Sequence, residues 1–281
     1  MMVHHNAYTN FMGKKSLQFT LETLEEMKIS APEALDSLTA KMGLTDEELK
    51  DWADKADKMY IPYSDETKLF EQHDGFFHLP HIDVSAIPVE EFPLYGHWSY
   101  ERIYRNDMLK QPDVLMFMML YGSEFTKEQL AVNFDYYEPR CIHESSLSPS
   151  IHSILACRLG RVEKAEDYFG FATRMDLDDY NRNTREGLHT TSIAGAWMNI
   201  IYGFGGLNSD GEELSLAPCI PKKWKKYTFS LRTKDSVFNV EVEQEKLTLR
   251  CVEGEPVTLR LYDRDITVTS SPVSYALAGK E

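Results

Sequence analysis

The chain has 281 residues, 42% of them hydrophobic, which is enough for one large domain or two modest ones around a buried core. A formal net charge of −15 argues against a nucleic-acid-binding protein, which would need basic patches. No apolar run reaches the roughly 18 residues of a membrane-spanning helix, and no apolar segment follows the N-terminus, so we expect a cytoplasmic protein without a secretory signal or a membrane partner.

The first part of the chain is predicted to be mostly helical. Apolar side chains recur at helical spacing at Leu17, Leu21, Leu24 and Met27. Ser30 and Pro32 mark the start of a further helix, and Thr45 with Glu48 three residues later has the form of a capping box. A stretch from about residue 60 to 96 then contains four prolines and many aromatic residues. It is typical of a functional loop, because its aromatic content argues against disorder.

Helices are expected to resume after residue 108, with Pro112 near a helix start. Ser148 is a predicted N-cap, with Pro149 in the first turn and the helix ending at Gly160. The segment from Thr190 onward is apolar almost all round, so we expect a buried helix there.

The pattern changes after about residue 210, where apolar and polar residues alternate with a period of two. This predicts roughly five short antiparallel strands separated by turns. We therefore expect a helical domain over residues 1–210 and a linker with a β-sheet domain over residues 211–281. Short helices with polar residues at their turns suit an (α/α)6 barrel, and six to eight helices would form only part of one. The predicted fold class is mainly α, a partial (α/α)6 barrel followed by a small antiparallel β-module.

A run of polar residues precedes the apolar helix in the sequence REGLHTTSIAGAW. His189, Thr190, Thr191 and Ser192 would lie where a helix presents unpaired N–H groups and a partial positive charge. Such a helix start with three hydroxyls and an imidazole can bind an anion, most naturally phosphate. Simple N-capping by serine and threonine accounts for the same residues.

Further polar residues are candidates for contacting a sugar. Lys110 and Gln111 lie at an expected helix start, an unusual place for lysine unless a ligand or the solvent pairs with it. Glu144, beside Arg140 and His143, could bind sugar hydroxyls or belong to a capped helix and its solvated loop.

A loop contains three histidines, His73, His78 and His81, near Phe76 and Phe77. His73 with the two phenylalanines could face a sugar or form a packed aromatic loop. No cysteine or acidic partner completes a four-coordinate site, and no two of the four cysteines form a CxxC pair, so we expect no metal centre.

Five stretches taken together resemble glycoside hydrolase family 65, the family of maltose, trehalose, kojibiose and nigerose phosphorylases. In chain order they are HHNAYTN, EQHDGFF, KQPDVL, EPRCIHESSLSPSIHS and REGLHTTSIAGAWMNIIYGFGGL. The resemblance implies an (α/α)6-barrel catalytic domain that transfers glucose from an α-glucosyl disaccharide to inorganic phosphate with inversion, giving β-glucose 1-phosphate. Phosphate would be a co-substrate, and no cofactor is implied.

The resemblance also implies roles for residues. His189, Thr190, Thr191 and Ser192 match the phosphate-binding segment, and Lys110, Gln111 and Glu144 look like sugar-contacting residues. The family's general acid precedes the NAYTN stretch, so it is expected upstream of Met1, which leaves no catalytic residue to assign in this chain. Met1 and Met2 would then be internal residues of a longer protein.

Several alternatives stay open. We expect the 281-residue chain to be inactive by itself, whereas a related hydrolase of the trehalase type, a non-catalytic carbohydrate-binding fragment, or a gene fragment without a role would also fit. Members of the family are often dimers, so a homodimer is one option for the longer parent. The acceptor sugar cannot be read from these residues.

Overall fold

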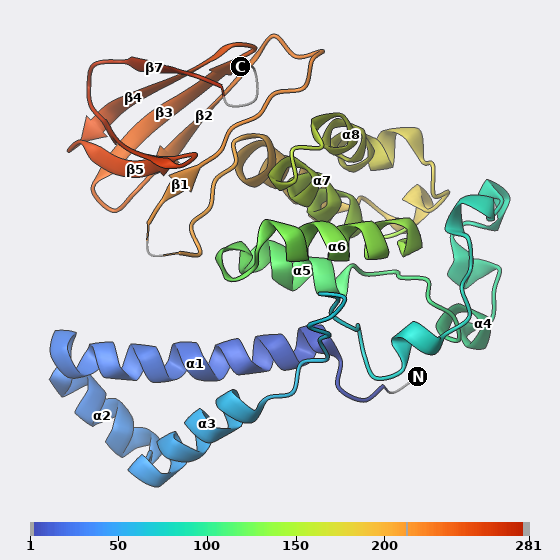
Figure 1. Cartoon of the computed structure of the whole chain (residues 1–281), viewed down its shortest axis with the longest axis horizontal. Coiled ribbons are helices and arrows are strands. Elements are labelled where there is room, and N and C mark those ends of the chain that lie inside the picture. The colour runs from blue at the N-terminus through green and yellow to red at the C-terminus, as the bar shows by residue number, and fades with distance from the viewer. Residues whose placement is uncertain (1–2, 212, 278–281) are drawn as a thin grey trace. The chain divides into compact units, whose positions relative to one another are not determined.

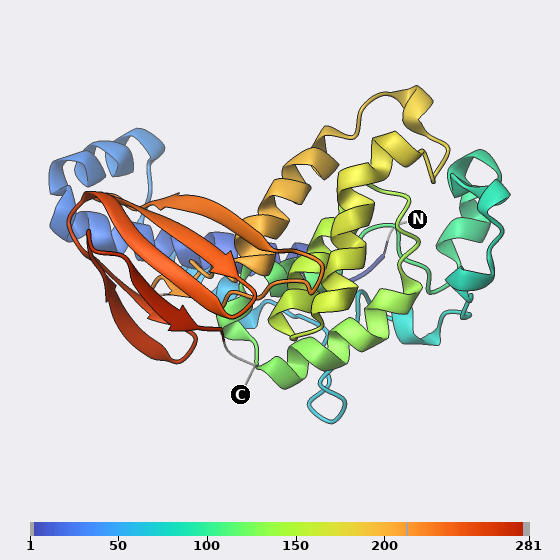
Figure 2. The ribbon, with the colours of Figure 1, turned by 90° about the horizontal axis from the view of Figure 1, so that it is seen from above.

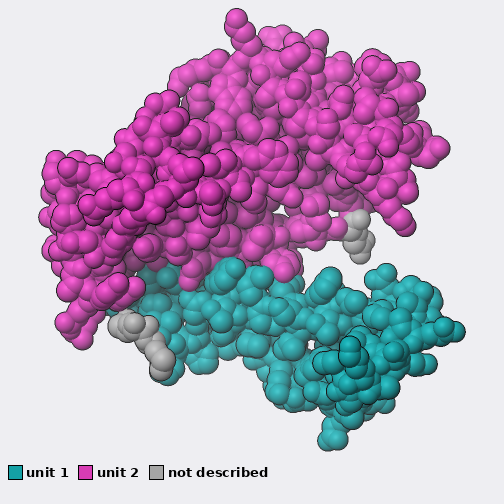
Figure 3. Space-filling view, turned by 180° about the vertical axis from the view of Figure 1, so that it is seen from behind, with its two compact units in different colours: residues 1–79 teal, residues 80–281 magenta. Residues whose placement is uncertain are grey.

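The computed structural model describes residues 3–211 and 213–277 (Figure 1). Met1 and Met2, which the resemblance makes internal residues of a longer protein, lie outside the described residues. The chain forms two compact units, residues 1–79 and 80–281, which Figure 3 distinguishes by colour. This division follows the packing of the chain, so the predicted domain boundary at residue 210 stays a prediction.

Three helices make up most of the first unit, α1 (Ala7–Ser30), α2 (Pro32–Met42) and α3 (Asp46–Lys58). Two of the predicted helix starts are confirmed. Pro32 begins α2, where its missing N–H would have had no partner in any case. The Thr45 side chain accepts a hydrogen bond from the Glu48 N–H at 3.2 Å and caps α3. α1 packs against α3, and Asn10 donates to the Tyr60 carbonyl oxygen at 2.7 Å.

The predicted irregular stretch is a series of short turns. In the first unit it contains a β-bridge between Tyr63 and Phe70 and the 3-10 turn η1 (Phe76–His78). The second unit continues with three more 3-10 turns and a short helix: η2 (Val84–Ala86), η3 (Val89–Glu91), η4 (Leu94–Gly96) and α4 (Tyr100–Tyr104). Leu94 and Trp98 form the centre of a small apolar cluster here, so burial of large side chains orders this segment.

A buried helix, α7 (Ser148–Arg158), forms the centre of the helical part of the second unit. It packs against α5, α8 and α9, and Figures 1 and 2 both show α8 beside it. The elements around it are α5 (Asp113–Leu120), η5 (Gly122–Glu124), α6 (Lys127–Tyr137), η6 (Glu138–Arg140), α8 (Val162–Asp178), η7 (Thr184–Glu186), α9 (Thr190–Met198) and the π-helix η8 (Asn199–Phe204). Among the described residues no helix combines the length and apolarity needed to cross a bilayer.

Two predictions about these helices are wrong in detail. Ser148 is not an N-cap but the first residue of α7, and its hydroxyl lies 3.0 Å from His143 Nδ1. The helix that begins at Thr190 is not buried all round, because Ile193 and Trp197 are 59% and 64% exposed. An apolar composition therefore did not reveal which face of α9 the rest of the chain covers.

The residues after 213 form two sheets. One contains β2, β3, β4 and β7 in that order, all antiparallel, and the other contains β1, β5 and β6. β1 pairs with β5 in parallel, so the prediction of a purely antiparallel module is wrong at that pair. The strands are β1 (Ser215–Leu216), β2 (Lys226–Arg232), β3 (Ser236–Glu243), β4 (Lys246–Gly254), β5 (Val257–Leu261), β6 (Arg264–Val268) and β7 (Val273–Ala276).

One apolar core joins the two sheets to the end of the helical part. Alternate residues of β3 point into this core, which also takes in Ile201 of η8 and Leu216 of β1. The Tyr227 hydroxyl donates to the Phe204 carbonyl oxygen at 2.6 Å, which ties β2 to the end of η8. The predicted class, mainly α with a following β-module, is confirmed.

Candidate functional site

The start of α9 is organised by a pair of residues, Asp176 and His189. Asp176 Oδ1 lies 2.5 Å from His189 Nδ1, and Asp176 Oδ2 accepts the His189 backbone N–H at 2.9 Å. Burial opposes ionisation of Asp176, but the hydrogen bonds from His189 outweigh it and hold the pKa of the carboxyl below its ordinary value. A carboxylate only accepts, so the proton lies on Nδ1 and the ring offers Nε2 to a ligand.

The three hydroxyl residues that follow have different surroundings. Thr190 and Thr191 are exposed at the first turn of α9. Ser192 is buried, and its hydroxyl donates to the Ala172 carbonyl oxygen of α8 at 2.9 Å. The Thr190 N–H bonds to the Leu188 carbonyl oxygen, and among the described residues the Thr191 N–H has no such partner. Thr190 and Thr191 are therefore accessible to an anion, whereas the Ser192 hydroxyl is already bonded within the protein.

A folded loop between α8 and α9 places His189. It turns at Asp179, whose φ is 45° and whose Oδ1 accepts the Thr184 N–H at 3.0 Å. Gly187 has a φ of 120°, a conformation that favours glycine. The Asn181 side chain donates to the His143 carbonyl oxygen at 2.9 Å, which connects this loop to the segment before α7.

A second polar group surrounds Glu144, which is 4% exposed. Its Oε2 accepts the Leu94 N–H at 2.8 Å, and its Oε1 lies 3.6 Å from Lys110 Nζ. Lys110 also lies over the Tyr95 ring, 4.9 Å from its centroid. The structure thus brings the predicted residues Lys110 and Glu144 together.

Tyr95 and Glu186 connect this group to the loop before His189. The Tyr95 hydroxyl donates to the Glu186 carboxylate at 2.6 Å. Burial and the neighbouring Glu186 raise the pKa of Tyr95 to about 12, so the phenol stays protonated and remains a donor. Neither residue was identified from the sequence. Tyr95 stands in no motif, and Glu186 belongs to the REGLHTTS stretch, but its partner lies 91 residues away.

Gln111 lies beside this group, just before α5 rather than within it. Its side-chain nitrogen donates to the Ser145 hydroxyl at 3.0 Å. Its Oε1 is buried, and within residues 3–211 and 213–277 no partner bonds to it. A buried acceptor without a partner is costly, so this oxygen is a place where a ligand hydroxyl or a water molecule would bind favourably.

His73 belongs to the first unit and is described there by itself. Its Nδ1 donates to the Asp74 carbonyl oxygen at 3.0 Å, and its ring meets the Phe76 ring edge-on with centroids 5.5 Å apart. This is the packed aromatic loop that the sequence allowed. A contact between His73 and a sugar stays a prediction.

Cys141, His143 and His152 form a group whose potential ligand atoms lie within 4.8 Å of one another. Ser148 already contacts both histidines. Its hydroxyl lies 3.0 Å from His143 Nδ1, and its carbonyl oxygen lies 2.8 Å from His152 Nδ1. Burial lowers the pKa of both histidines and raises that of Cys141 to about 11, so all three groups are neutral near pH 7. We interpret the group as part of the core beneath the segment that contains Glu144.

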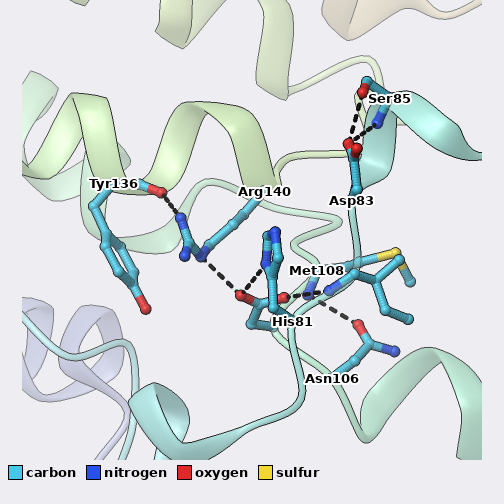
Figure 4. A network of polar contacts seen from close by, with 9 residues as sticks. His81, Asp83, Ser85, Asn106, Met108, Tyr136 and Arg140 are labelled. Carbon is cyan, nitrogen blue, oxygen red and sulfur yellow. Dashed lines mark hydrogen bonds and ion pairs between the residues drawn. The ribbon is translucent and has the colours of Figure 1, made fainter.

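Figure 4 shows a third polar network, which includes His81 and Arg140. Both residues contact the buried Asp107. Asp107 Oδ2 accepts a hydrogen bond from Arg140 Nε at 2.8 Å and lies 2.8 Å from His81 Nδ1. The other carboxylate oxygen, Oδ1, accepts the Ile82 N–H at 3.1 Å. Arg140 also stacks on Tyr136, with its guanidinium carbon 3.9 Å from the ring centroid. Through these contacts Asp107 holds two segments in place. Arg140 belongs to η6, and His81 belongs to the loop before η2.

Comparison with known protein families gives matches along most of the chain. The glycosyl hydrolase family 65 central catalytic domain matches residues 1–198, and the C-terminal domain of the same family matches residues 207–268. The first match agrees with the predicted partial (α/α)6 barrel.

Similar proteins include three named phosphorylases. An alpha,alpha-trehalose phosphorylase of Thermoanaerobacter brockii is 42% identical over 97% of this chain and 35% of its own length. A maltose phosphorylase of Bacillus subtilis is 38% identical over 95% of the chain and 34% of its own length. A kojibiose phosphorylase of Halothermothrix orenii is 32% identical over 92% of the chain and 33% of its own length. The chain thus spans about a third of the length of these relatives.

A solved structure, described as a putative kojibiose phosphorylase from human microbiome, superposes with a TM-score of 0.88 at 47% sequence identity. The superposition covers 98% of this chain and 36% of that one. With both family domains matched in order and the fold shared, the chain belongs to glycosyl hydrolase family 65.

Proposed function

We propose that this chain supplies the phosphate-binding helix start and the sugar-contacting side chains of an inverting α-glucosyl disaccharide phosphorylase. The observation that carries the proposal is the exposed start of α9, where His189 is held by Asp176 beside two accessible threonines. Helix N–H groups, hydroxyls and an imidazole are the groups that bind phosphate. The phosphorylase names of the relatives support the same reading.

In the proposed reaction, a phosphate oxygen attacks the anomeric carbon of the glucosyl unit from the face opposite the leaving sugar. The glycosidic bond breaks, and the leaving oxygen takes a proton from a carboxylic acid. His189, Thr190 and Thr191 would bind the phosphate, and Lys110, Gln111 and Glu144 would bind sugar hydroxyls. Phosphate replaces the activated water of an inverting hydrolase, so one carboxylic acid is enough.

We propose further that the 281-residue chain does not turn over its substrates by itself. Asp176 accepts two hydrogen bonds from His189, and the buried Glu144 accepts from the Leu94 N–H and faces Lys110. The hydrogen bonds to Asp176 hold its pKa below the ordinary value, and both carboxylates are already engaged within the protein, which does not suit a proton donor. A positioned general acid contributes about 10²–10⁴ in rate, so its absence would reduce phosphorolysis strongly.

Calorimetry with inorganic phosphate tests the first proposal. We expect the chain to bind phosphate and the His189→Gln variant to bind it at least tenfold more weakly, because one hydrogen bond to a charged group is lost. The exposed His97→Gln variant is the matched control and should bind like the original chain. Absence of phosphate binding by the original chain would refute the assignment of the site.

An activity assay tests the second proposal. Maltose, trehalose and kojibiose are each incubated with the chain, with and without phosphate, and glucose 1-phosphate and glucose are measured. We expect no turnover. Phosphate-dependent formation of glucose 1-phosphate would contradict the proposed inactivity, and phosphate-independent release of glucose would instead favour a hydrolase of the trehalase type.

A further inference from the structure

We propose that Asp176 is a positioning residue of the candidate phosphate site, orienting His189 and fixing a proton on its Nδ1 so that Nε2 is directed to the anion. This inference rests on the proposed function, because it assigns a role within the phosphate site. No part of the sequence pattern pointed to Asp176. It lies in a short acidic run at the end of α8, which alone is typical of a solvated helix end.

The geometry fixes His189 at two points. One oxygen of Asp176 lies 2.5 Å from the ring nitrogen Nδ1, and the other accepts the backbone N–H of the same residue at 2.9 Å. The ring therefore cannot rotate away without breaking a hydrogen bond, and the backbone at the start of α9 is held in the same contact. The two side chains are only 17% and 16% exposed, so solvent screens their interaction less than it screens a surface pair.

The support for Asp176 extends into the packing of two helices. The buried Ser192 hydroxyl of α9 donates to the Ala172 carbonyl oxygen of α8 at 2.9 Å. Ala172 lies one helical turn before Asp176, so this hydrogen bond joins the two helices close to the pair. Asp179, in the same run of acids, accepts the Thr184 N–H. Asp178 is paired with Arg174 at 2.6 Å. Of the three acids in this run, Asp176 is the one bonded to His189.

The chemical consequence follows from the carboxylate of Asp176, which only accepts. With its proton on Nδ1, His189 presents Nε2 as an acceptor for the P–OH group of hydrogen phosphate. An asparagine at this position would keep the shape and could still accept the backbone N–H. Its amide would donate to Nδ1 and place the ring proton on Nε2, so the acceptor that Nε2 offers to the P–OH group would be lost. A loss of about tenfold in phosphate affinity is expected.

The affinity test compares the 281-residue chain with its Asp176→Asn and Asp178→Asn variants by calorimetry with inorganic phosphate. The two variants carry the same chemical change two residues apart on one helix. We expect Asp176→Asn to bind phosphate about tenfold more weakly and Asp178→Asn to bind it as the original chain does. Equal affinity in the two variants would overturn the proposal.

The second readout is the tautomer of His189, observed by long-range ¹H–¹⁵N correlation and assigned with the His189→Gln variant. We expect Nδ1 to carry a proton in the original chain and to lose it in Asp176→Asn, with Nε2 protonated instead. An unprotonated Nδ1 in the original chain would overturn the proposal, and this measurement does not need the variant to fold. If the original chain binds no phosphate, the proposed function fails, and the tautomer alone decides the role of Asp176.

Discussion

At the scale of single residues, burial determines the charge of the histidines beneath the candidate site. His152 is fully buried, and its pKa falls from 6.5 to about 4 because burial disfavours the charged ring. His143 next to it is shifted in the same direction. The folded protein therefore keeps both rings neutral over a pH range in which the unfolded chain would take up protons.

This predicts a specific pH dependence of stability. Between pH 6.5 and 4 the unfolded state binds a proton at His152 that the native state does not, so the free energy of unfolding decreases as the pH falls. The contribution of one such group is at most about 1.4 kcal/mol per pH unit. Urea unfolding at pH 7 and pH 5 should show a smaller decrease for His152→Asn than for the original chain.

The exposed His97→Asn variant, which makes the same chemical change at the surface, serves as the control. Its pH dependence should match that of the original chain. An equal pH dependence in His152→Asn would show that His152 is not held neutral by the fold.

The residues of the site divide into those that a motif reveals and those that only contacts reveal. His189, Thr190 and Thr191 stand at a helix start, which the sequence pattern was sufficient to predict, and their binding of phosphate stays a prediction. Asp176 contacts His189 and Glu186 contacts Tyr95, and these partners lie 13 and 91 residues away in the sequence. A local pattern carries no information about such a distant partner.

At the scale of elements, the close contact of α7 with α9 depends on a glycine. A Cβ atom added to Gly195 would lie 2.3 Å from Ser150 Oγ and 2.8 Å from Ser150 Cβ. Both positions are buried, so neither side chain can move into solvent. Because Gly195 has no side chain, α9, which carries the candidate phosphate site, can pack this closely against α7.

We expect Gly195→Ala to lower the free energy of unfolding by about 1–3 kcal/mol, because overpacking forces the two helices apart. Gly170→Ala on α8 is the matched control. An added Cβ there meets no atom within 4 Å, so this variant should gain about 0.4–1 kcal/mol from the lower entropy of its unfolded chain. Urea titration measures both, and a Gly195→Ala protein as stable as Gly170→Ala would contradict the packing described.

Element boundaries were predicted well where the signal is local. Pro32 and Thr45 start helices in the expected way, and the period of two in β3 matches its burial pattern. Ser148 carries the same kind of signal, but its hydroxyl contacts His143 and does not cap the helix. Tertiary contacts competed with the local preference and prevailed at that position.

At the scale of the whole molecule, apolar side chains remain uncovered on the α8–α9 part of the second unit. They are Leu177, Leu188, Ile193 and Trp197, exposed at 77%, 74%, 59% and 64%. Large apolar side chains gathered on neighbouring elements favour association with another surface. The chain should therefore associate with itself at high concentration.

Sedimentation velocity at increasing concentration tests this expectation. The Ile193→Lys variant should show a smaller concentration-dependent shift toward larger species than the original chain. Val252→Lys, at an exposed position on β4, makes the same change away from these four side chains and should behave like the original chain. A monomeric original chain throughout the concentration range would refute the prediction.

The sequence by itself determined the class of this protein, since helix caps, proline positions, strand alternation and five ordered motifs each depend on residues close together in the chain. Only the tertiary structure decided which polar groups meet, such as Asp176 with His189 and Glu144 with the Leu94 N–H. It also decided that α9 has one exposed face and that β1 pairs in parallel with β5. The physical reason is that a local preference is worth about 1 kcal/mol or less, whereas burial and long-range hydrogen bonds act together and can outweigh it.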